Sequence, residues 1–315
     1  MFPPPETIAT EVFARLPSSL HQTGRPSQWL ADRHVTMHSF LEGPAFDRQG
    51  HLWCVDLAHG RLLRVSPEGG FEVALQYDGE PNGLKIHRDG RVFVADHRHG
   101  IMVHVPGSGR IEPFLANVRR EGLKGVNDLL FASNGDLYFT DQGESALEDP
   151  TGRVFRLRAD GVTVDLLMSG LAGPNGLVLD EARRILYVAV TRENAVFSLP
   201  IEPGYGGMRK AGRFVQMSGA TGPDGLALDE QGNLAVVHAG AGTVWVFSRL
   251  GEPLYRIRSC AGLRTTNLAY GGDDRRTLYV TEAEQGVILR ARLPVPGRPM
   301  YSHTDTGDRP MEETR

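Results

Sequence analysis

Cysteine is scarce in this sequence, because only Cys54 and Cys260 occur among its 315 residues. Two thiols so far apart in the chain make neither a disulfide framework nor a zinc knuckle, both of which need more cysteines at closer spacing. We expect both residues to be small, buried, apolar side chains. Neither a disulfide-stapled fold nor a thiolate zinc site is therefore expected.

The sequence also lacks a strong charge excess and a long apolar run. It has 34 Lys and Arg against 38 Asp and Glu, a net charge of −4, and no basic run that would neutralise a phosphate backbone. The N-terminal MFPPPETIATEVFARLP carries Pro and Glu where a secretory signal has a basic start and an apolar run, and no later stretch reaches membrane-spanning length. We expect a cytoplasmic protein with neither a nucleic acid nor a membrane partner.

The composition that is present suits a globular protein with a sizeable core, since 40% of residues are hydrophobic and 23% charged. Gly and Pro punctuate the whole chain, and no linker-like shift divides it. We therefore expect one domain over residues 1–295. Residues 296–315, rich in Pro, Asp, Thr and Arg, are predicted to form a mobile tail.

One unit recurs along the chain, most clearly as EPNGLKIH from Glu80, GPNGLVLD from Gly173 and PDGLALD from Pro223. Each copy starts at an acidic or amide residue, and successive copies lie about 40 to 50 residues apart. Two alternating apolar stretches follow each start and flank a polar turn such as DRQG or HRDG, which is typical of a β-hairpin. The six starting residues are Glu42, Asn82, Asn127, Asn175, Asp224 and Asn267.

Two further strands follow each hairpin, so that each unit has four strands and six units predict an all-β, six-bladed β-propeller. A pair of β-sandwiches is the alternative, but it does not explain why every unit opens with a ligand-capable residue. Helix content should be near zero, although the apolar spacing over residues 8–16 would also allow a short helix. The last unit lacks its fourth strand, which the segment ATEVFARLP from Ala9 can supply, closing the ring.

In a propeller the six starting residues form a ring around one mouth of the central channel. A second ring, about 14 residues further on in each unit, should lie radially outside it and contains Asp56, Asp96, Asp141, Val190, His238 and Glu282. Such residues can also simply bond to the backbone at strand ends, an alternative that is strongest for Asn82 and Asn267. Carboxylates crowded at one mouth repel each other unless a cation neutralises them, so the inner ring predicts a divalent metal site.

The order EGPAFD, VNDLLF, GPNGLVLD, GPDGLALD resembles the gluconolactonase, regucalcin and luciferin-regenerating family of six-bladed propellers, from about Glu11 to Leu293. This resemblance implies one divalent cation held by Glu42, Asn127, Asn175 and Asp224, and hydrolysis of a sugar lactone such as gluconolactone. Calcium is the preferred ion, with Zn²⁺, Mn²⁺, Mg²⁺ and Fe²⁺ left open. TDQGES and TGRVFRL look more like the bacterial gluconolactonases. Vertebrate members have an Arg where this chain has Gly125, so the sugar preference does not carry over.

We expect Asp224 to act as general base or nucleophile, with His238 and Asp141 either orienting it or taking the base role. Asn82, Asn267, Trp29 and Glu144 are expected to contact the lactone. The long segment 18–41, here called the lid segment, ends just before Glu42 and should cover the site.

Two other functions remain open. The ligand pattern is also similar to that of diisopropyl fluorophosphatase, which predicts an organophosphate hydrolase. A non-catalytic propeller with a structural ion fits the same ring. A closed propeller needs no partner to cover its edges, so we expect a monomer or a weak homo-oligomer.

Overall fold

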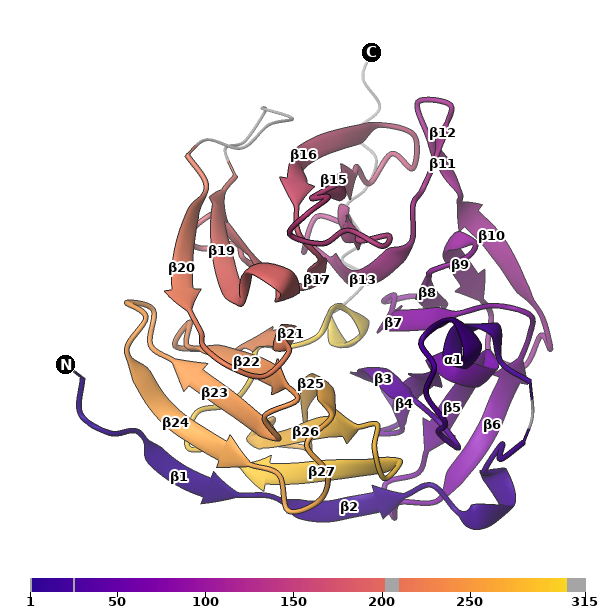
Figure 1. Cartoon of the computed structure of the whole chain (residues 1–315), viewed down its shortest axis with the longest axis horizontal. Coiled ribbons are helices and arrows are strands. Elements are labelled where there is room, and N and C mark those ends of the chain that lie inside the picture. Colours follow the sequence, from indigo (N-terminus) through magenta and orange to yellow (C-terminus); the bar gives the residue numbers. More distant parts are fainter. Residues whose placement is uncertain (1, 25, 202–209, 305–315) are drawn as a thin grey trace.

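The computed structural model describes residues 2–24, 26–201 and 210–304. Six antiparallel sheets of four strands stand around a central axis, with a fifth strand added to one of them (Figure 1). The predicted six-bladed β-propeller is thereby confirmed. No helix in these described ranges is long and apolar enough to cross a membrane.

The first three blades follow one another in the chain from the inner strand outwards. Blade 1 has β3 (Leu41–Phe46), β4 (Leu52–Asp56), β5 (Arg61–Val65) and β6 (Phe71–Gln76). Blade 2 has β7 (Pro81–Ile86), β8 (Val92–Asp96), β9 (Gly100–His104) and β10 (Ile111–Leu115). Blade 3 has β13 (Val126–Phe131), β14 (Leu137–Asp141), β15 (Gly152–Leu157) and β16 (Val164–Leu171), preceded by the short hairpin β11 (Asn117–Val118) and β12 (Glu121–Gly122).

The other three blades repeat this pattern. Blade 4 has β17 (Pro174–Asp180), β18 (Ile185–Val190), β19 (Ala195–Pro200) and β20 (Gly212–Gln216). Blade 5 has β21 (Gly222–Leu228), β22 (Leu234–Ala239), β23 (Thr243–Phe247) and β24 (Pro253–Arg258). Blade 6 has β25 (Thr265–Gly271), β26 (Thr277–Glu282) and β27 (Val287–Arg292).

All six inner strands carry a register shift at the same place, next to the polar residue that starts each repeat. A bulge of this kind takes residues out of the ladder and lets their side chains turn into the channel. This is the local reason why polar side chains converge on the axis. The shifts lie between Glu42 and Ala45, Pro81 and Gly83, Val126 and Leu129, Pro174 and Leu177, Pro223 and Leu226, and Thr265 and Leu268.

The glycines of the repeated motif allow neighbouring inner strands to approach each other. A Cβ atom on Gly43 would lie 2.7 Å from the carbonyl oxygen of Asn82, and one on Gly83 would lie 2.8 Å from that of Asn127. Real Cβ contacts are not this short, so a side chain at either position would push two blades apart. The Asn-Gly and Asp-Gly pairs therefore serve strand packing at the axis rather than hairpin turns.

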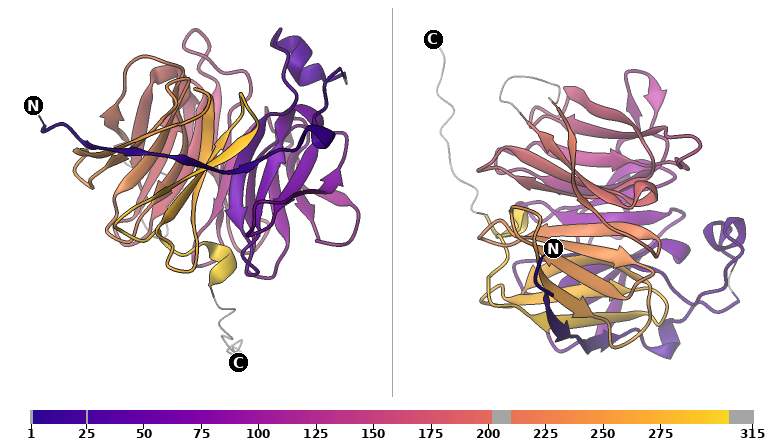
Figure 2. Two further views of the ribbon diagram at one scale, coloured as in Figure 1. Left: turned by 90° about the horizontal axis from the view of Figure 1, so that it is seen from below. Right: turned by 60° about the vertical axis from the view of Figure 1, so that its left-hand side comes forward.

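The N-terminal segment closes the ring, as predicted. Strand β2 (Glu11–Arg15) pairs antiparallel with β27 and completes blade 6, and β1 (Glu6–Ala9) adds a parallel strand to the outer edge of β24 (Figure 2). The alternative of a short helix over residues 8–16 is wrong. Phe13 packs edge-on against Tyr279, 5.1 Å between ring centres, and such burial on the sheet favours the extended conformation.

Residues 296–304 differ from the predicted mobile tail, because they pack under the centre of the propeller. Gly297 forms an isolated bridge with Asp229, and the Arg298 guanidinium lies 3.0 Å from the Asp180 carboxylate. The segment ends in the 3₁₀ helix η4 (Tyr301–His303), where Tyr301 and Ser302 are buried. These contacts order the segment despite its polar composition. The rest of the predicted tail, 305–315, lies outside the described residues.

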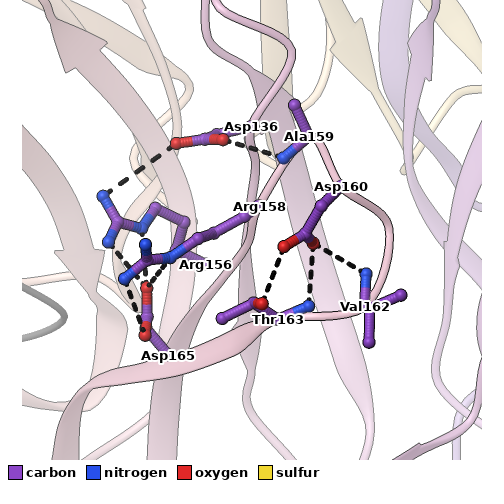
Figure 3. A network of polar contacts seen from close by, with 8 residues as sticks. All are labelled: Asp136, Arg156, Arg158, Ala159, Asp160, Val162, Thr163 and Asp165. Carbon is purple, nitrogen blue, oxygen red and sulfur yellow. Dashed lines mark hydrogen bonds and ion pairs between the residues drawn. The ribbon is translucent and has the colours of Figure 1, made fainter. Parts of the chain in front are cut away.

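A network of charged side chains joins the two outer strands of blade 3 (Figure 3). Asp165 on β16 accepts hydrogen bonds from Arg156 Nε at 3.1 Å and Arg158 Nε at 3.0 Å. Asp136 lies 3.9 Å from Arg156 Nη1 and accepts a hydrogen bond from the Ala159 backbone. Burial raises the pKa of Asp165, but the hydrogen bonds from Arg158 and Arg156 outweigh it and hold the pKa below its usual range.

Replacement Asp165→Asn should lower the free energy of unfolding by about 2 kcal/mol, because it leaves the buried Arg156 guanidinium without its main partner. The measurement is urea unfolding at neutral pH. Since the folded pKa lies below the ordinary 3.8, the stabilisation is present above that pH and should fade as the pH falls through the folded pKa.

The matched control is Asp78→Asn. Its partner Arg98 is exposed and Asp78 itself is 87% exposed, so this substitution should change the unfolding free energy by less than about 0.5 kcal/mol. Equal effects of the two substitutions would show that the blade 3 network contributes nothing beyond a surface pair.

Candidate active site

A polar cavity of about 640 Å³ opens at one mouth of the central channel. Glu42, Asn127, Asn175 and Asp224, which start the repeats of blades 1, 3, 4 and 5, line it together. Asn82 of blade 2 lines it as well. Five of the six residues that start a repeat are thus brought to one site, because the bulge of each inner strand lies at the same height in its blade.

Asn267, the starting residue of blade 6, lies deeper in the channel and is not among the residues that line this cavity. Its Nδ2 atom donates to Glu42 Oε2 at 3.0 Å and to Asp128 Oδ2 at 3.3 Å, while its Oδ1 atom accepts from the Leu268 backbone at 2.8 Å. Its polar atoms are thereby engaged inside the protein. These contacts favour a role in positioning Glu42 over the predicted contact with substrate.

Asp128 is a third channel carboxylate that the sequence analysis missed. It follows Asn127 within the bulge of β13, is 3% exposed, and has Lys85 Nζ 3.7 Å from its Oδ1 atom. The repeat predicts one inward side chain per inner strand, whereas the bulge of β13 turns both Asn127 and Asp128 towards the axis. A signal was available in VNDLLF, where Asp128 follows Asn127 as a second polar residue in a strand that is apolar elsewhere.

Ionisation of the carboxylates in this cluster is costly, because they are buried and lie close to one another. Burial and then the charge of Asp128 raise the pKa of Glu42 to about 8. Burial, followed by the charges of Glu42 and Asp128, raises the pKa of Asp224 well above its usual range. Buried carboxylates of this kind need a compensating positive charge in order to stay ionised.

Two of the four predicted metal ligands also have oxygen atoms without a donor. Asn127 Oδ1 and Asp224 Oδ1 are buried and have no hydrogen-bond partner, although Asn127 Nδ2 donates to Gln142 at 3.2 Å. A buried oxygen without a donor is costly, and a hard cation satisfies it. The four residues, two carboxylates and two amides, therefore fit a divalent metal ion.

Groups of three or more His, Cys, Asp or Glu side chains placed to share a metal are absent from the described part of the chain. The predicted ligand set contains only two residues of these types, since its other members are Asn127 and Asn175. An oxygen-rich mixture of carboxylates and amides is the kind of ligand set that Ca²⁺ accepts.

The predicted outer ring ties down the loops that enter the inner strands. Asp141 Oδ1 accepts from the backbone of Lys124 at 2.7 Å and of Gly125 at 2.9 Å, while Arg153 Nε donates to its other oxygen at 2.8 Å. Asp56 and Asp96 accept backbone hydrogen bonds from Phe40 and Glu80 in the same manner, whereas Glu282 accepts one from Glu284 in the turn after β26. This shared pattern favours a structural role for Asp141.

His238 likewise forms a hydrogen bond with the backbone, with its Nε2 atom 3.0 Å from the Gly219 carbonyl oxygen. Neither His238 nor Asp141 belongs to the lining of the cavity that holds Asp224. Burial lowers the pKa of His238, which favours its neutral form at neutral pH. The structure thus brings neither residue to the cavity in which we expected both to act.

The lid segment, residues 18–41, contains the 3₁₀ helix η1 (Ser18–Leu20) and the short helix α1 (Gln28–Asp32), and α1 stands out from the face of the propeller over blades 1 and 2 (Figures 1 and 2). Trp29 and Phe40 line the cavity and stack edge-on, 4.8 Å between ring centres. Arg33 lies 3.2 Å from Glu144 of blade 3, which is also 3.3 Å from His97. The segment is therefore joined to blade 3 through Glu144, which blade 2 also holds through His97.

The wall of the cavity also contains Arg192 and His97, which the sequence did not predict as site residues. Arg192, in the 3₁₀ helix η3 (Thr191–Glu193), lines the cavity, and its positive charge opposes the rise in the pKa of Asp224. The His97 ring occupies the space where a side chain at Gly125 would stand, since a Cβ atom there would lie 2.6 Å from His97 Nδ1. Both placements depend on contacts between blades, which sequence spacing does not reveal.

Comparison with known proteins agrees with this fold. The family model described as SMP-30/Gluconolactonase/LRE-like region matches residues 40–284. Lactonase drp35 of Staphylococcus aureus (strain MRSA252) is 30% identical over 228 residues, which are 69% of this chain and 69% of that protein.

Solved structures show the same architecture at lower identity. A regucalcin described as a calcium-binding protein, from Agrobacterium tumefaciens, matches with a TM-score of 0.75 and 20% identity, covering 94% of this chain and 99% of its own. A gluconolactonase from Xanthomonas campestris matches with a TM-score of 0.72 and 21% identity, covering 93% and 99%. The family match spans most of the propeller and includes all four proposed metal ligands. The chain therefore belongs to the SMP-30/gluconolactonase/LRE-like family.

Proposed function

We propose that this protein is a metal-dependent hydrolase that opens a lactone ring, with a sugar lactone as its substrate. The observation that carries the proposal is the floor of the polar cavity, where Glu42 and Asp224 are buried carboxylates with raised pKa values and Asp224 Oδ1 lacks a donor. Lactonase and gluconolactonase are the names of relatives in sequence and in fold. The proposed setting is the cytoplasm.

Glu42, Asn127, Asn175 and Asp224 are the residues proposed to hold the ion, with Ca²⁺ preferred because all four offer oxygen. A divalent ion there supplies Lewis acidity that polarises the lactone carbonyl and stabilises the negative charge that develops on its oxygen. The buried Asn267 side chain donates hydrogen bonds to both Glu42 and Asp128, and it thereby fixes the position of the Glu42 carboxylate.

Asp224 is proposed to take the proton from the attacking water, since its carboxylate lines the cavity in which the lactone would bind. The water oxygen then bonds to the carbonyl carbon, the ring C–O bond breaks, and the proton passes to the leaving alkoxide. Direct attack by the Asp224 carboxylate is the alternative within the same geometry. Either route ends in the open hydroxy acid.

The walls of the cavity favour a polyhydroxylated substrate. Asn82, Gln142 and Arg192 offer amide and guanidinium groups around the floor, and Glu144 is held at the rim by Arg33 and His97. Hydroxyl groups of a sugar lactone can both donate to and accept from such side chains. Trp29 and Phe40 add an apolar surface on the lid side.

The direct test is acid release from glucono-1,5-lactone in a pH-stat, with and without EDTA, corrected for spontaneous hydrolysis. We expect metal-dependent release. Fluoride release from a phosphorofluoridate, without lactone hydrolysis, would support the organophosphate alternative. Failure of a full lactone panel together with unchanged metal binding would support a non-catalytic propeller.

Replacement Asp224→Asn should lower kcat for the lactone by about 1,000-fold, because it removes both a metal ligand and the proposed base. Glu148→Gln is the matched control, since Glu148 is exposed at the rim of the same cavity. It should retain nearly full activity. Comparable turnover in the Asp224→Asn protein and the control would remove Asp224 from the mechanism.

Calcium at about 100 times its Kd should raise the free energy of unfolding by about 3 kcal/mol relative to the EDTA-treated protein. Glu42→Gln should lose most of this rise, because it removes one of the two proposed anionic ligands. The measurement is denaturant unfolding with and without Ca²⁺, which is independent of any substrate. An undiminished rise in Glu42→Gln would place the ion elsewhere.

Trp29→Ala should raise KM for the lactone by about tenfold, because it removes an apolar wall of the cavity and the packing that holds α1. Steady-state kinetics give KM and kcat separately. Leu250→Ala is the control, since Leu250 is 75% exposed in the turn between β23 and β24. Unchanged kinetics in Trp29→Ala would show that the lid segment takes no part in binding.

A further inference from the structure

The central channel opens again at the opposite face of the propeller, into a second cavity of about 480 Å³. Strand β3 connects the two ends, because Glu42 lines the first cavity while Pro44 and Ala45 line the second. The helix η4 lies under the centre of this face, and α1 stands on the other side of the propeller (Figure 2). The two cavities are therefore separate sites.

The second cavity is mainly apolar. All six inner strands contribute aliphatic or aromatic side chains at their far ends, among them Ile86, Leu130, Leu177, Leu228 and Leu268. Left empty, such a space deprives its wall atoms of contacts, and apolar walls hold water poorly. Its size lies in the range of ordinary small-molecule pockets. An occupant with an apolar body suits it best.

Three hydrogen-bonding groups in this lining lack a close partner. The hydroxyl groups of Tyr270 and Tyr301 are buried and have no hydrogen-bond partner. Lys85 Nζ lies 3.7 Å from Asp128 Oδ1, which is longer than a hydrogen bond. An ammonium group only donates, so an acceptor beside Lys85 would add a hydrogen bond to its ion pair with Asp128, and each phenol can likewise donate to an acceptor of its own.

Other charged groups of the lining already have partners. Glu181 accepts from the backbone and the hydroxyl of Ser133, and Arg298 pairs with Asp180 at 3.0 Å. The groups of the lining that can still donate a hydrogen bond therefore outnumber those that can still accept one, which favours a ligand with an acceptor group. Lys85 adds a positive charge. A carboxylate is an acceptor-only group with the complementary charge.

The C-terminal segment 298–304 forms one wall of this cavity and is held by side-chain contacts. The Tyr301 ring stacks on Phe131, 5.1 Å between centres, and the Arg88 guanidinium lies 5.3 Å above it. Met300 packs on apolar clusters of blades 1 and 2. The wall is thus continuous with the propeller core rather than a loose cover.

We propose that this second cavity binds a small apolar carboxylic acid, with its chain among the six inner strands and its carboxylate towards Lys85. None of the four proposed metal ligands lines this cavity, although Lys85 also faces Asp128 of the channel.

Decanoate is the probe, and isothermal titration calorimetry should show saturable one-to-one binding to the full-length protein. Ala227→Phe and Val178→Phe each fill part of the cavity from a half-buried wall position. Each should weaken decanoate binding about tenfold or more while leaving lactone turnover within about twofold. Leu250→Phe, on an exposed turn, is the matched control and should bind normally.

The role of Lys85 is tested with a neutral ligand of the same length. Lys85→Met should weaken decanoate about tenfold and leave decan-1-ol unaffected, because only the carboxylate uses the charge. Thermal unfolding establishes that each variant is folded. The proposal is overturned if the wild-type protein shows no saturable binding, or if both folded cavity-filling variants keep wild-type affinity. Equal loss of decanoate and decan-1-ol in Lys85→Met would overturn the carboxylate assignment.

Discussion

The constraint on which this structure depends is the burial of three carboxylates at one point of the central channel. Burial and the charge of Asp128 raise the pKa values of Glu42 and Asp224, and the charge of Glu42 adds to the rise at Asp224. Isolated side chains on a mobile scaffold would move apart or be protonated. A rigid ring can hold them together, and the proposed cation would compensate their mutual repulsion.

The rigid ring comes from the geometry of the inner strands and from the closure of the propeller. Bulges in every inner strand turn the polar side chains inward, and glycines such as Gly43 and Gly83 let neighbouring blades approach at the axis. Pairing of β2 with β27 leaves the ring without a gap. The same inner strands run from polar residues at one end to aliphatic residues at the other, which gives the channel a polar mouth and an apolar one.

Most of the fold could be predicted from the sequence, because each blade is specified by a local repeat of alternating apolar residues. The segment from Ala9 could be assigned to blade 6 since that blade lacked a strand, and its residues Glu11–Arg15 form β2. The parallel pairing of β1 with β24 and the packing of residues 296–304 could not be predicted. Both depend on contacts with distant blades, and neither segment carries a repeat of its own.

For the candidate site, the sequence by itself determined which residue starts each blade, and therefore that Glu42, Asn127, Asn175 and Asp224 share one mouth. The sequence did not determine how far into the channel each of these side chains lies. Only the tertiary structure decided that Asp128 joins them, that Asn267 bonds inward to Glu42, and that His97 fills the space above Gly125. A repeat fixes the position of a residue along its strand. How far its side chain reaches into the channel, and which side chain it meets there, follow from the bulges and from the close approach of neighbouring blades.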